Sequence, residues 1–356
     1  MLFTPLRRRL PVVAAVAAVA LTAVGCGSSS SSGGGAATTR ADPNGRFTIG
    51  YDVYWLGNSW STQLAEEFRA AVERNRDSIE NVVYTQSDNQ VQKQISNIQS
   101  MISRRVDAII MTPISPSASV PVIQQANRAG IPVVLVAAQA DTRDTAAEVR
   151  ADDVVFGRTG AEWLVRKLGG RGNIYVLNGL PGFSTDTLRW KGAKDVFDRY
   201  PGIKVVADAH AAWDTARAKT AVSNMLAAHP DVDGVWSQGG AMTLGAIQAF
   251  RAAGHPLVPM TGENSNGLMK VWDQLKRSGD RSFDSIGVVN PTWVGSEALT
   301  QTLNLLRGDE VRKVNLVNPE PITSSTLDRY VRPDLPDSFW VDTRLDDAQI
   351  RALFDR

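Results

Sequence analysis

The fold of this 356-residue chain is decided by residues 47–75, which read FTIGYDVYWLGNSWSTQLAEEFRAAVERN. Alternating apolar residues at the start of this stretch predict a β-strand: Phe47, Ile49, Tyr51 and Val53. Beyond a short loop, helical spacing predicts a helix whose apolar face carries Leu64, Ala65, Phe68, Ala71 and Val72. The opposite face of that helix is expected to turn away from the core with Glu66, Glu67, Arg69 and Glu73. Strand, loop and helix in this order form the first half of a βαβ unit.

The loop at residues 54–60 is the first candidate for a binding site. Ligands of open α/β sheets bind outside the carboxyl ends of strands, and this loop lies at such an end. It carries three aromatic residues, an amide and hydroxyl groups, and it has no glycine-rich phosphate cradle. Such groups suit a neutral sugar or polyol better than a phosphate. Either tryptophan, Trp55 or Trp60, could simply pack the loop onto the sheet. The aromatic and polar residues of the loop taken together favour a ligand pocket.

The composition is that of a soluble globular protein, with 43% hydrophobic and 21% charged residues. The formal net charge of +1 gives no indication of a nucleic-acid partner. The single cysteine, Cys26, excludes an intrachain disulfide. Acidic loops of calcium spacing, Walker loops and His-Glu-x-x-His motifs are missing from the sequence, so neither a metal nor a cofactor is expected.

The N-terminus is predicted to be an export signal covering residues 1–25. Arginines at positions 7–9 precede an apolar run at 11–24 that is too short to span a bilayer comfortably. The sequence Ala23-Val24-Gly25-Cys26 resembles a lipobox, with Ala23 in place of the usual leucine. It predicts a lipid anchor on Cys26. A plain secretory signal with an incidental cysteine is the alternative.

Residues 26–45 are predicted to tether the folded part to this anchor. Positions 28–39 contain only Gly, Ser, Ala and Thr, which is typical of a flexible linker. The folded part is therefore expected on the extracytoplasmic side of the cell membrane, in the periplasm or cell envelope.

From residue 46 onward, predicted strands and helices alternate. Further strands are predicted at residues 81–85, 106–111, 131–136, 173–177, 203–209, 234–237, 257–261 and 285–289. Further helices are predicted at residues 90–103, 120–128, 154–168, 189–200, 216–228, 242–253, 268–278 and 292–306. This alternation predicts an α/β fold with parallel, doubly wound sheets. The number of strands favours two lobes over one sheet.

Several stretches along this alternation carry a family resemblance: RVDAIIMTP at 105–113, AGIPVV at 129–134, ADD with two later glycines at 151–160, Arg189 with Gly192, HPDVDGV at 229–235 and LGA at 244–246. With them, residues 46 to about 322 resemble the type I periplasmic-binding-protein family, the ribose-binding-like receptors of ABC importers. The resemblance implies two Rossmann-like lobes that are joined by a three-segment hinge and close around a ligand.

The resemblance also implies the boundaries of the two lobes. Crossings near residues 150, 290 and 320 place 46–150 plus 291–318 in the first lobe and 151–290 plus 319–356 in the second. The tail at 323–356 is similar to an extension of one sugar-receptor branch. It is expected to strap the lobes or the hinge.

Matching the motifs one by one implies a set of ligand-binding residues: Tyr54, Asn58, Trp60, Gln139, Arg189, Trp213, Gln238, Asn264 and Asn290. The fork of an arginine donates in fixed directions, which suits vicinal hydroxyls at Arg189. An indole is a good partner for the apolar C–H face of a sugar, which is the role implied for Trp213. A core tryptophan is the alternative for that residue.

Three departures from ribose receptors point to a different ligand. An Asp-Arg pair is replaced by Ala137-Ala138, an Asn-Asp pair by Gly239-Gly240, and a usual aspartate by Asn264. These replacements imply a roomier and less charged pocket. A different sugar, a sugar alcohol or a glycoside is therefore expected.

The predicted function is that of a monomeric, lipid-anchored solute receptor that delivers a sugar-type ligand to an ABC permease. A receptor for a non-sugar solute, or for a sensory partner in the membrane, remains an alternative. A carbohydrate-acting enzyme using Asp152 and Asp153 is a remote one, because a helix N-cap is the simpler role for this pair. Sugar-responsive repressors share this type of fold but carry a DNA-binding helix pair at the N-terminus. This chain has a predicted signal and tether in that place, so a repressor is not expected.

Overall fold

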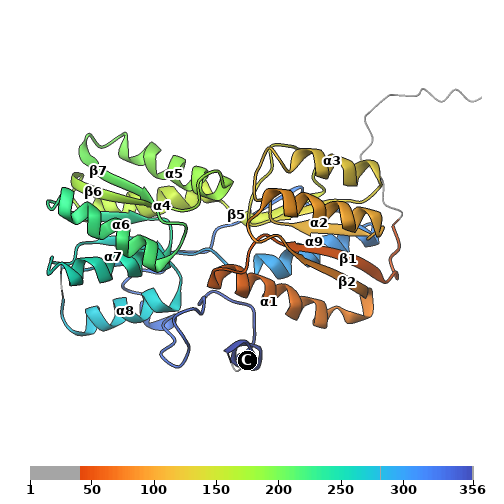
Figure 1. Ribbon diagram of the computed structural model, residues 1–356. Coiled ribbons are helices and arrows are strands. Elements are labelled where there is room, and N and C mark those ends of the chain that lie inside the picture. Colours follow the sequence, from red (N-terminus) through yellow and green to blue (C-terminus); the bar gives the residue numbers. More distant parts are fainter. Residues whose placement is uncertain (1–40, 281, 355–356) are drawn as a thin grey trace, which may run out of the picture. The chain divides into compact units, whose positions relative to one another are not determined.

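The computed structural model describes residues 41–280 and 282–354, so the predicted signal, Cys26 and most of the tether lie outside the described part. Two parallel sheets, each with helices on both faces, form two α/β lobes (Figure 1). Every ladder between neighbouring strands in the described residues is parallel. The predicted fold class is therefore confirmed.

The first lobe has a six-stranded sheet in the order β11-β5-β4-β3-β1-β2. Its strands are β1 (Phe47–Val53), β2 (Ile79–Gln86), β3 (Ala108–Met111), β4 (Val133–Val136), β5 (Ala147–Ala151) and β11 (Val314–Val317). Its helices are α1 (Ser59–Arg74), α2 (Val91–Ser103), α3 (Val120–Arg128) and α9 (Val294–Arg307).

The second lobe has a five-stranded sheet in the order β10-β9-β8-β6-β7. Its strands are β6 (Arg171–Asn178), β7 (Gly202–His210), β8 (Gly234–Ser237), β9 (Met260–Glu263) and β10 (Ser285–Val288). Its helices are α4 (Asp153–Lys167), α5 (Ser184–Phe197), α6 (Thr215–Ala228), α7 (Gly240–Ala252) and α8 (Asn266–Arg277). Two 3-10 turns, Arg76–Ser78 and Leu327–Arg329, and a last helix, α10 (Asp347–Phe354), complete the described elements.

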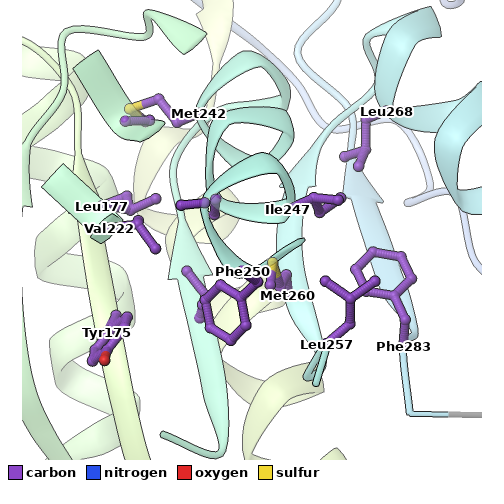
Figure 2. Packing of buried hydrophobic residues seen from close by; sticks show 14 of the residues in the cluster. Tyr175, Leu177, Val222, Met242, Ile247, Phe250, Leu257, Met260, Leu268 and Phe283 are labelled. Atoms are coloured by element: carbon purple, nitrogen blue, oxygen red, sulfur yellow. The ribbon is translucent and has the colours of Figure 1, made fainter. Parts of the chain in front are cut away.

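Each sheet separates two hydrophobic cores, because successive side chains of a strand point to opposite faces. Tyr175 and Leu177 of β6 pack with α6, α7 and α8, and Figure 2 shows this core with Phe250 of α7. Ile174 and Val176 of the same strand pack with α4 and α5 on the other face. Burial on both faces explains the continuous apolar runs of the central strands.

The strand order also positions a ligand site in each lobe. In both sheets the order reverses next to the first strand of the lobe, between β1 and β3 and between β6 and β8. Open α/β sheets bind ligands at such switch points, outside the carboxyl ends of the strands. The loops that follow β1, β3, β6 and β8 are therefore the expected walls of a site.

Some elements differ from the sequence-based expectation. Helix α5 begins at Ser184, five residues earlier than predicted, and β5, β11 and α10 were not predicted at all. Strand β5 reads AEVRA and looks like a polar loop. It is nevertheless buried, because Glu148 and Arg150 pair with each other at 3.4 Å.

The orientation predicted for Glu67 is wrong. This carboxylate is 0% exposed, because the C-terminal segment covers that side of α1. Its Oε1 accepts hydrogen bonds from Thr343 Oγ1, from the backbone N–H of Arg344 at 3.1 Å and from Thr292 Oγ1 at 3.3 Å.

The end of the chain, which was grouped with the second lobe and expected to strap the lobes or the hinge, contacts both lobes. Ile322 pairs with Gly287 of β10 in the second lobe. Further on, Leu345 and Ile350 form an apolar cluster that packs against Ala70 of α1 in the first lobe. The tail crosses from the second lobe to the first because its apolar residues pack on apolar surface of α1.

Close packing of α4 against α5 generates a first prediction. A Cβ added to Gly157 of α4 would lie 1.8 Å from the backbone oxygen of Arg189 on α5. We expect Gly157→Ala to lower the free energy of unfolding by about 1–3 kcal/mol, since the helices must move apart. Urea denaturation followed by circular dichroism measures this loss.

The matched control is Gly160→Ala on the same helix. The nearest atom to its added Cβ would be the side-chain Nε1 of Trp236 at 3.3 Å, so a smaller loss is expected. Equal losses for the two variants would contradict the close contact between the helices.

Candidate functional site

A cavity lies at the carboxyl ends of the strands of both sheets, with about 630 Å³ of empty space when its opening to solvent is included. Its aromatic wall consists of Tyr54, Trp60, Phe183, Trp213 and Trp340. Its polar groups belong to Asn58, Ser59, Thr112, Thr185, Arg189, Glu263 and Asn290.

The structure brings six of the nine sequence-predicted residues to the wall of this cavity: Tyr54, Asn58, Trp60, Arg189, Trp213 and Asn290. It does not bring Gln139, Gln238 or Asn264 there. The Gln238 amide turns inward and donates to Asn178 Oδ1 at 2.9 Å. Asn264 is 0% exposed and accepts at Oδ1 from the backbone N–H of Asn290 at 2.9 Å.

Gln139 sits at the edge of the first lobe, where its backbone N–H donates to Ser184 Oγ at 3.0 Å. Its side-chain amide faces the guanidinium of Arg150. These contacts hold the end of β4 near the start of α5.

Besides Ala137 and Gly239, which were named only as replacements, seven lining residues are absent from the predicted set: Ser59, Thr112, Phe183, Thr185, Ala241, Glu263 and Trp340. Glu263 is the last residue of β9, so the rule that sites gather at strand ends could have found it. Ser59, Phe183 and Thr185 lie at helix starts after β1 and β6, where the same rule applies. Trp340 follows no strand and carried no such signal.

The charged centre of the site is the buried Arg189 of α5, which is 1% exposed. Its Nε donates to Asp153 Oδ1 at 3.0 Å, and its Nη1 donates to Glu263 Oε1 at 2.6 Å and to the carbonyl of Gln238 at 2.9 Å. The guanidinium also lies 3.7 Å from the centre of the Phe156 ring. Arg189 thus joins α4, α5, β8 and β9 from inside.

Burial raises the pKa of Asp153 and of Glu263 above their ordinary values, and the charge of Arg189 opposes this rise. Burial also disfavours the charged guanidinium, yet the two carboxylates raise the pKa of Arg189. Arg189 is therefore held in its charged form by two carboxylates, and each carboxylate has its cationic partner inside the protein.

The neighbouring Asp152 has a structural role. Its Oδ1 accepts from the backbone N–H groups of Val154 and Val155, both at 3.1 Å, and so caps α4. The expectation of a helix N-cap is confirmed, and the Asp152-Asp153 pair does not line the cavity.

Trp213 is held in a strained position at the cavity wall. Its φ of 54° lies in the left-handed region, which side-chain-bearing residues seldom adopt. The indole lies against Gly179, where a Cβ would come within 2.2 Å of the ring. Its Nε1 is buried and has no hydrogen-bond partner among the described residues, so the side chain contributes a ring face to the site.

The first loop connects the two lobes at the site. Asn58 Oδ1 caps α1 by accepting from Ser61 N–H at 2.8 Å, and Asn58 Nδ2 donates to Tyr54 Oη at 3.3 Å. Trp60 Nε1 donates to the carbonyl of Asn290 at 2.9 Å. Asn290 Nδ2 reaches Glu263 Oε1 at 3.2 Å. A continuous chain of bonds therefore runs from α1 to the Arg189 cluster.

Among residues 41–280 and 282–354, no three His, Cys, Asp or Glu side chains are arranged to hold a metal. In this described part, no helix has the length and apolar character needed to cross a membrane.

Comparison with known proteins defines the class. Residues 49–310 match the family of the periplasmic binding protein domain, and the chain belongs to this family of extracytoplasmic binding proteins. It is 32% identical to a xylitol-binding protein of Mycolicibacterium smegmatis over 90% of this chain and 87% of that protein. It is 27% identical to the ribose import binding protein of Bacillus subtilis over 75% of this chain and 84% of that protein.

Solved structures share the fold. An ABC transporter solute binding protein from Thermobispora bispora gives a TM-score of 0.75 at 24% identity, covering 86% of this chain and 94% of that one. An ABC transporter solute binding protein from Bacillus halodurans with bound myo-inositol gives a TM-score of 0.73 at 22% identity, and the match covers 81% of this chain and 98% of that one.

The buried ionic cluster generates a second prediction. Arg189→Leu leaves Asp153 and Glu263 buried without their cation, so we expect a loss of about 3–5 kcal/mol in the free energy of unfolding at pH 7. Urea denaturation measures it. Arg199→Leu is the control, because Arg199 is exposed and lies 3.9 Å from its partner Glu162, and a change within about 0.5 kcal/mol is expected.

The loss should also depend on pH. A carboxyl whose folded-state pKa is raised stabilises the fold fully below its unfolded pKa of about 4 and loses that contribution as pH rises through the folded value. Removing Arg189 raises both folded pKa values further, so the deficit of Arg189→Leu should be larger at pH 8 than at pH 5. A deficit that grows on acidification would contradict this account.

Proposed function

We propose that this protein is the solute-binding component of an ABC importer and binds a sugar or sugar alcohol in the cavity. The observation that carries the proposal is the combination of flat aromatic faces with hydrogen-bonding side chains on one cavity wall. Arg189 is paired with both Asp153 and Glu263, so its positive charge is met within the protein and needs no anionic group on the ligand.

The aromatic wall supports a carbohydrate. The C–H face of a sugar or polyol is apolar and packs on an indole, while its hydroxyls need both donors and acceptors. The Ser59 hydroxyl and the Asn290 amide at the wall can donate, and the Glu263 carboxylate there accepts. The names of the xylitol-binding and ribose import relatives support the same ligand class.

The replacements in the wall support a ligand other than ribose. Ala137 and Gly239 line the cavity where ribose receptors are expected to carry larger polar or charged groups. Smaller side chains leave more room and remove charge, which favours a sugar alcohol, a larger sugar or a glycoside.

The proposed role is binding and closure, without chemistry on the ligand. Asp152 is committed to its helix cap, and Asp153 is committed to Arg189. Neither lines the cavity as a free acid and base pair would need to.

We further propose that the protein is a monomer held at the membrane by a lipid on Cys26. Residues 46–150 with 291–318, and 151–290, are the proposed moving bodies, with the ligand between them. The closed form would present the surface that the permease recognises.

A ligand screen tests the function. The mature chain from position 26, carrying Cys26→Ala, is heated with pentitols, pentoses, hexoses, myo-inositol, amino acids and nucleosides. A ligand at about 1,000 times its Kd adds roughly 4 kcal/mol to stability, so we expect a clear rise in Tm with one carbohydrate class.

Trp213→Ala should weaken that ligand at least about tenfold, and Trp55→Ala is the control because Trp55 belongs to the same kind of loop but does not line the cavity. A rise in Tm only with an amino acid or a nucleoside would keep the fold and overturn the sugar assignment.

Membrane anchoring is tested in cells. Wild-type protein should sediment with membranes, and Cys26→Ala should move it to the soluble envelope fraction or the medium. Equal sedimentation of both would overturn the lipid anchor. A Ser29→Ala variant controls for changes in the tether.

A further inference from the structure

Helix α1 carries a polar stripe that faces the C-terminal segment. Ser59, Gln63 and Glu67 follow one another at intervals of four residues and so share one side of the helix. Ser59 Oγ accepts from the indole Nε1 of Trp340 at 3.0 Å. The Gln63 amide accepts from the backbone N–H of Trp340 and donates to its carbonyl, both at 2.9 Å.

The residues after Trp340 extend this attachment to the first lobe. Arg344 N–H and Thr343 Oγ1 donate to Glu67. Trp293 Nε1 donates to Asp342 Oδ2 at 2.9 Å, and the Arg344 guanidinium lies 3.9 Å from the centre of the Trp293 ring.

The residues before Trp340 are attached to the second lobe. Asn266 Nδ2 donates to the carbonyls of Arg332 at 2.7 Å and Leu335 at 3.1 Å. The backbone N–H of Asn266 donates to the carbonyl of Phe339 at 2.8 Å. Next to Trp340, Val341 N–H donates to the carbonyl of Asn264 at 3.2 Å. We call residues 332–345 the clasp.

Trp340 therefore stands where the clasp passes from one lobe to the other. The backbone N–H of Trp340 bonds Gln63 in the first lobe, and the next N–H, of Val341, bonds Asn264 in the second. The Trp340 side chain lines the cavity between these two attachments. Asn264 also holds the cavity residue Asn290 through its Oδ1.

We propose that Trp340 is a ligand-contact residue and that ligand binding tightens the clasp across both lobes. This inference rests on the proposed function, since it concerns the same cavity. A sugar or polyol lying against the indole would keep Trp340 in place, and with it the adjacent bonds to Gln63 and Asn264. The C-terminal segment is then part of the binding site as well as a strap.

Affinity measurements test the contact. Xylitol, D-ribose and myo-inositol are titrated calorimetrically into the mature chain carrying Cys26→Ala, and the tightest of the carbohydrates is used for all variants. We expect Trp340→Ala to weaken it at least about tenfold and Trp340→Phe to weaken it less, because a ring face remains. Phe339→Leu is the matched control, since this neighbouring clasp residue is buried but does not line the cavity, and it should stay within about threefold.

Amide hydrogen exchange tests whether ligand binding is coupled to the clasp. A tryptophan with a structural role alone would not make the exchange rates of the clasp depend on the ligand. The amides of Trp340 and Val341 report the attachments to the two lobes separately. We expect saturating carbohydrate to slow exchange of both amides at least about fivefold in the wild type and to have less effect in Trp340→Ala.

The outcomes separate this inference from the proposed function. If no carbohydrate binds the wild type, both the proposed function and the ligand contact at Trp340 are overturned. If Trp213→Ala loses affinity while Trp340→Ala binds as tightly as the wild type, the function stands and the contact at Trp340 is overturned. Exchange of the two amides that is the same with and without ligand would overturn the coupling.

Discussion

The site depends on the burial of one guanidinium between two carboxylates. Arg189 comes from α5, Asp153 from the start of α4 and Glu263 from the end of β9, so a single ionic group fixes three elements. A charge withdrawn from water is tolerated only when it is paired and hydrogen-bonded, which makes each partner necessary to the others. The close contact of Gly157 with the Arg189 backbone places the helices at the distance that this pairing needs.

The same pairing shapes the chemistry that a ligand meets. Because Arg189 is held by two carboxylates of the protein, its guanidinium and the Glu263 carboxylate at the cavity wall are fixed in direction. The strained backbone of Trp213 adds a fixed indole face, and its contact with Gly179 keeps that face from rotating away. Groups that are held in place before binding lose little conformational freedom on binding, so they favour affinity for a small neutral ligand.

The C-terminal segment adds a connection between the lobes to those made by the chain after β5, β10 and β11. It reaches the first lobe through the polar stripe of α1, in which Gln63 bonds the carbonyl of Trp340 and, at 3.1 Å, the hydroxyl of Thr292 in the segment after β10. Thr292 also bonds Glu67 of the same stripe. Helix α1 therefore contacts the ligand loop, the connection between β10 and α9, and the tail together.

The fold class could be predicted from the amino-acid sequence, because hydrophobic periodicity follows from local geometry. The first loop could be predicted as a site because parallel strands bring their carboxyl ends together, and the family resemblance supplied the other site residues. Tyr54 lies in the loop that follows the first predicted strand, whereas Trp213 was implied by the resemblance to a family motif. Other features depend on contacts between distant parts of the chain. Strand β5 was not predicted because Glu148 and Arg150 interrupt its apolar pattern, and both are buried as a pair. Glu67 was predicted to face away from the core, but the tail covers it. Trp340 reaches the cavity through bonds to Gln63, a residue 277 positions earlier. Local patterns carry no information about such a contact, because it depends on how the lobes and the tail pack in space.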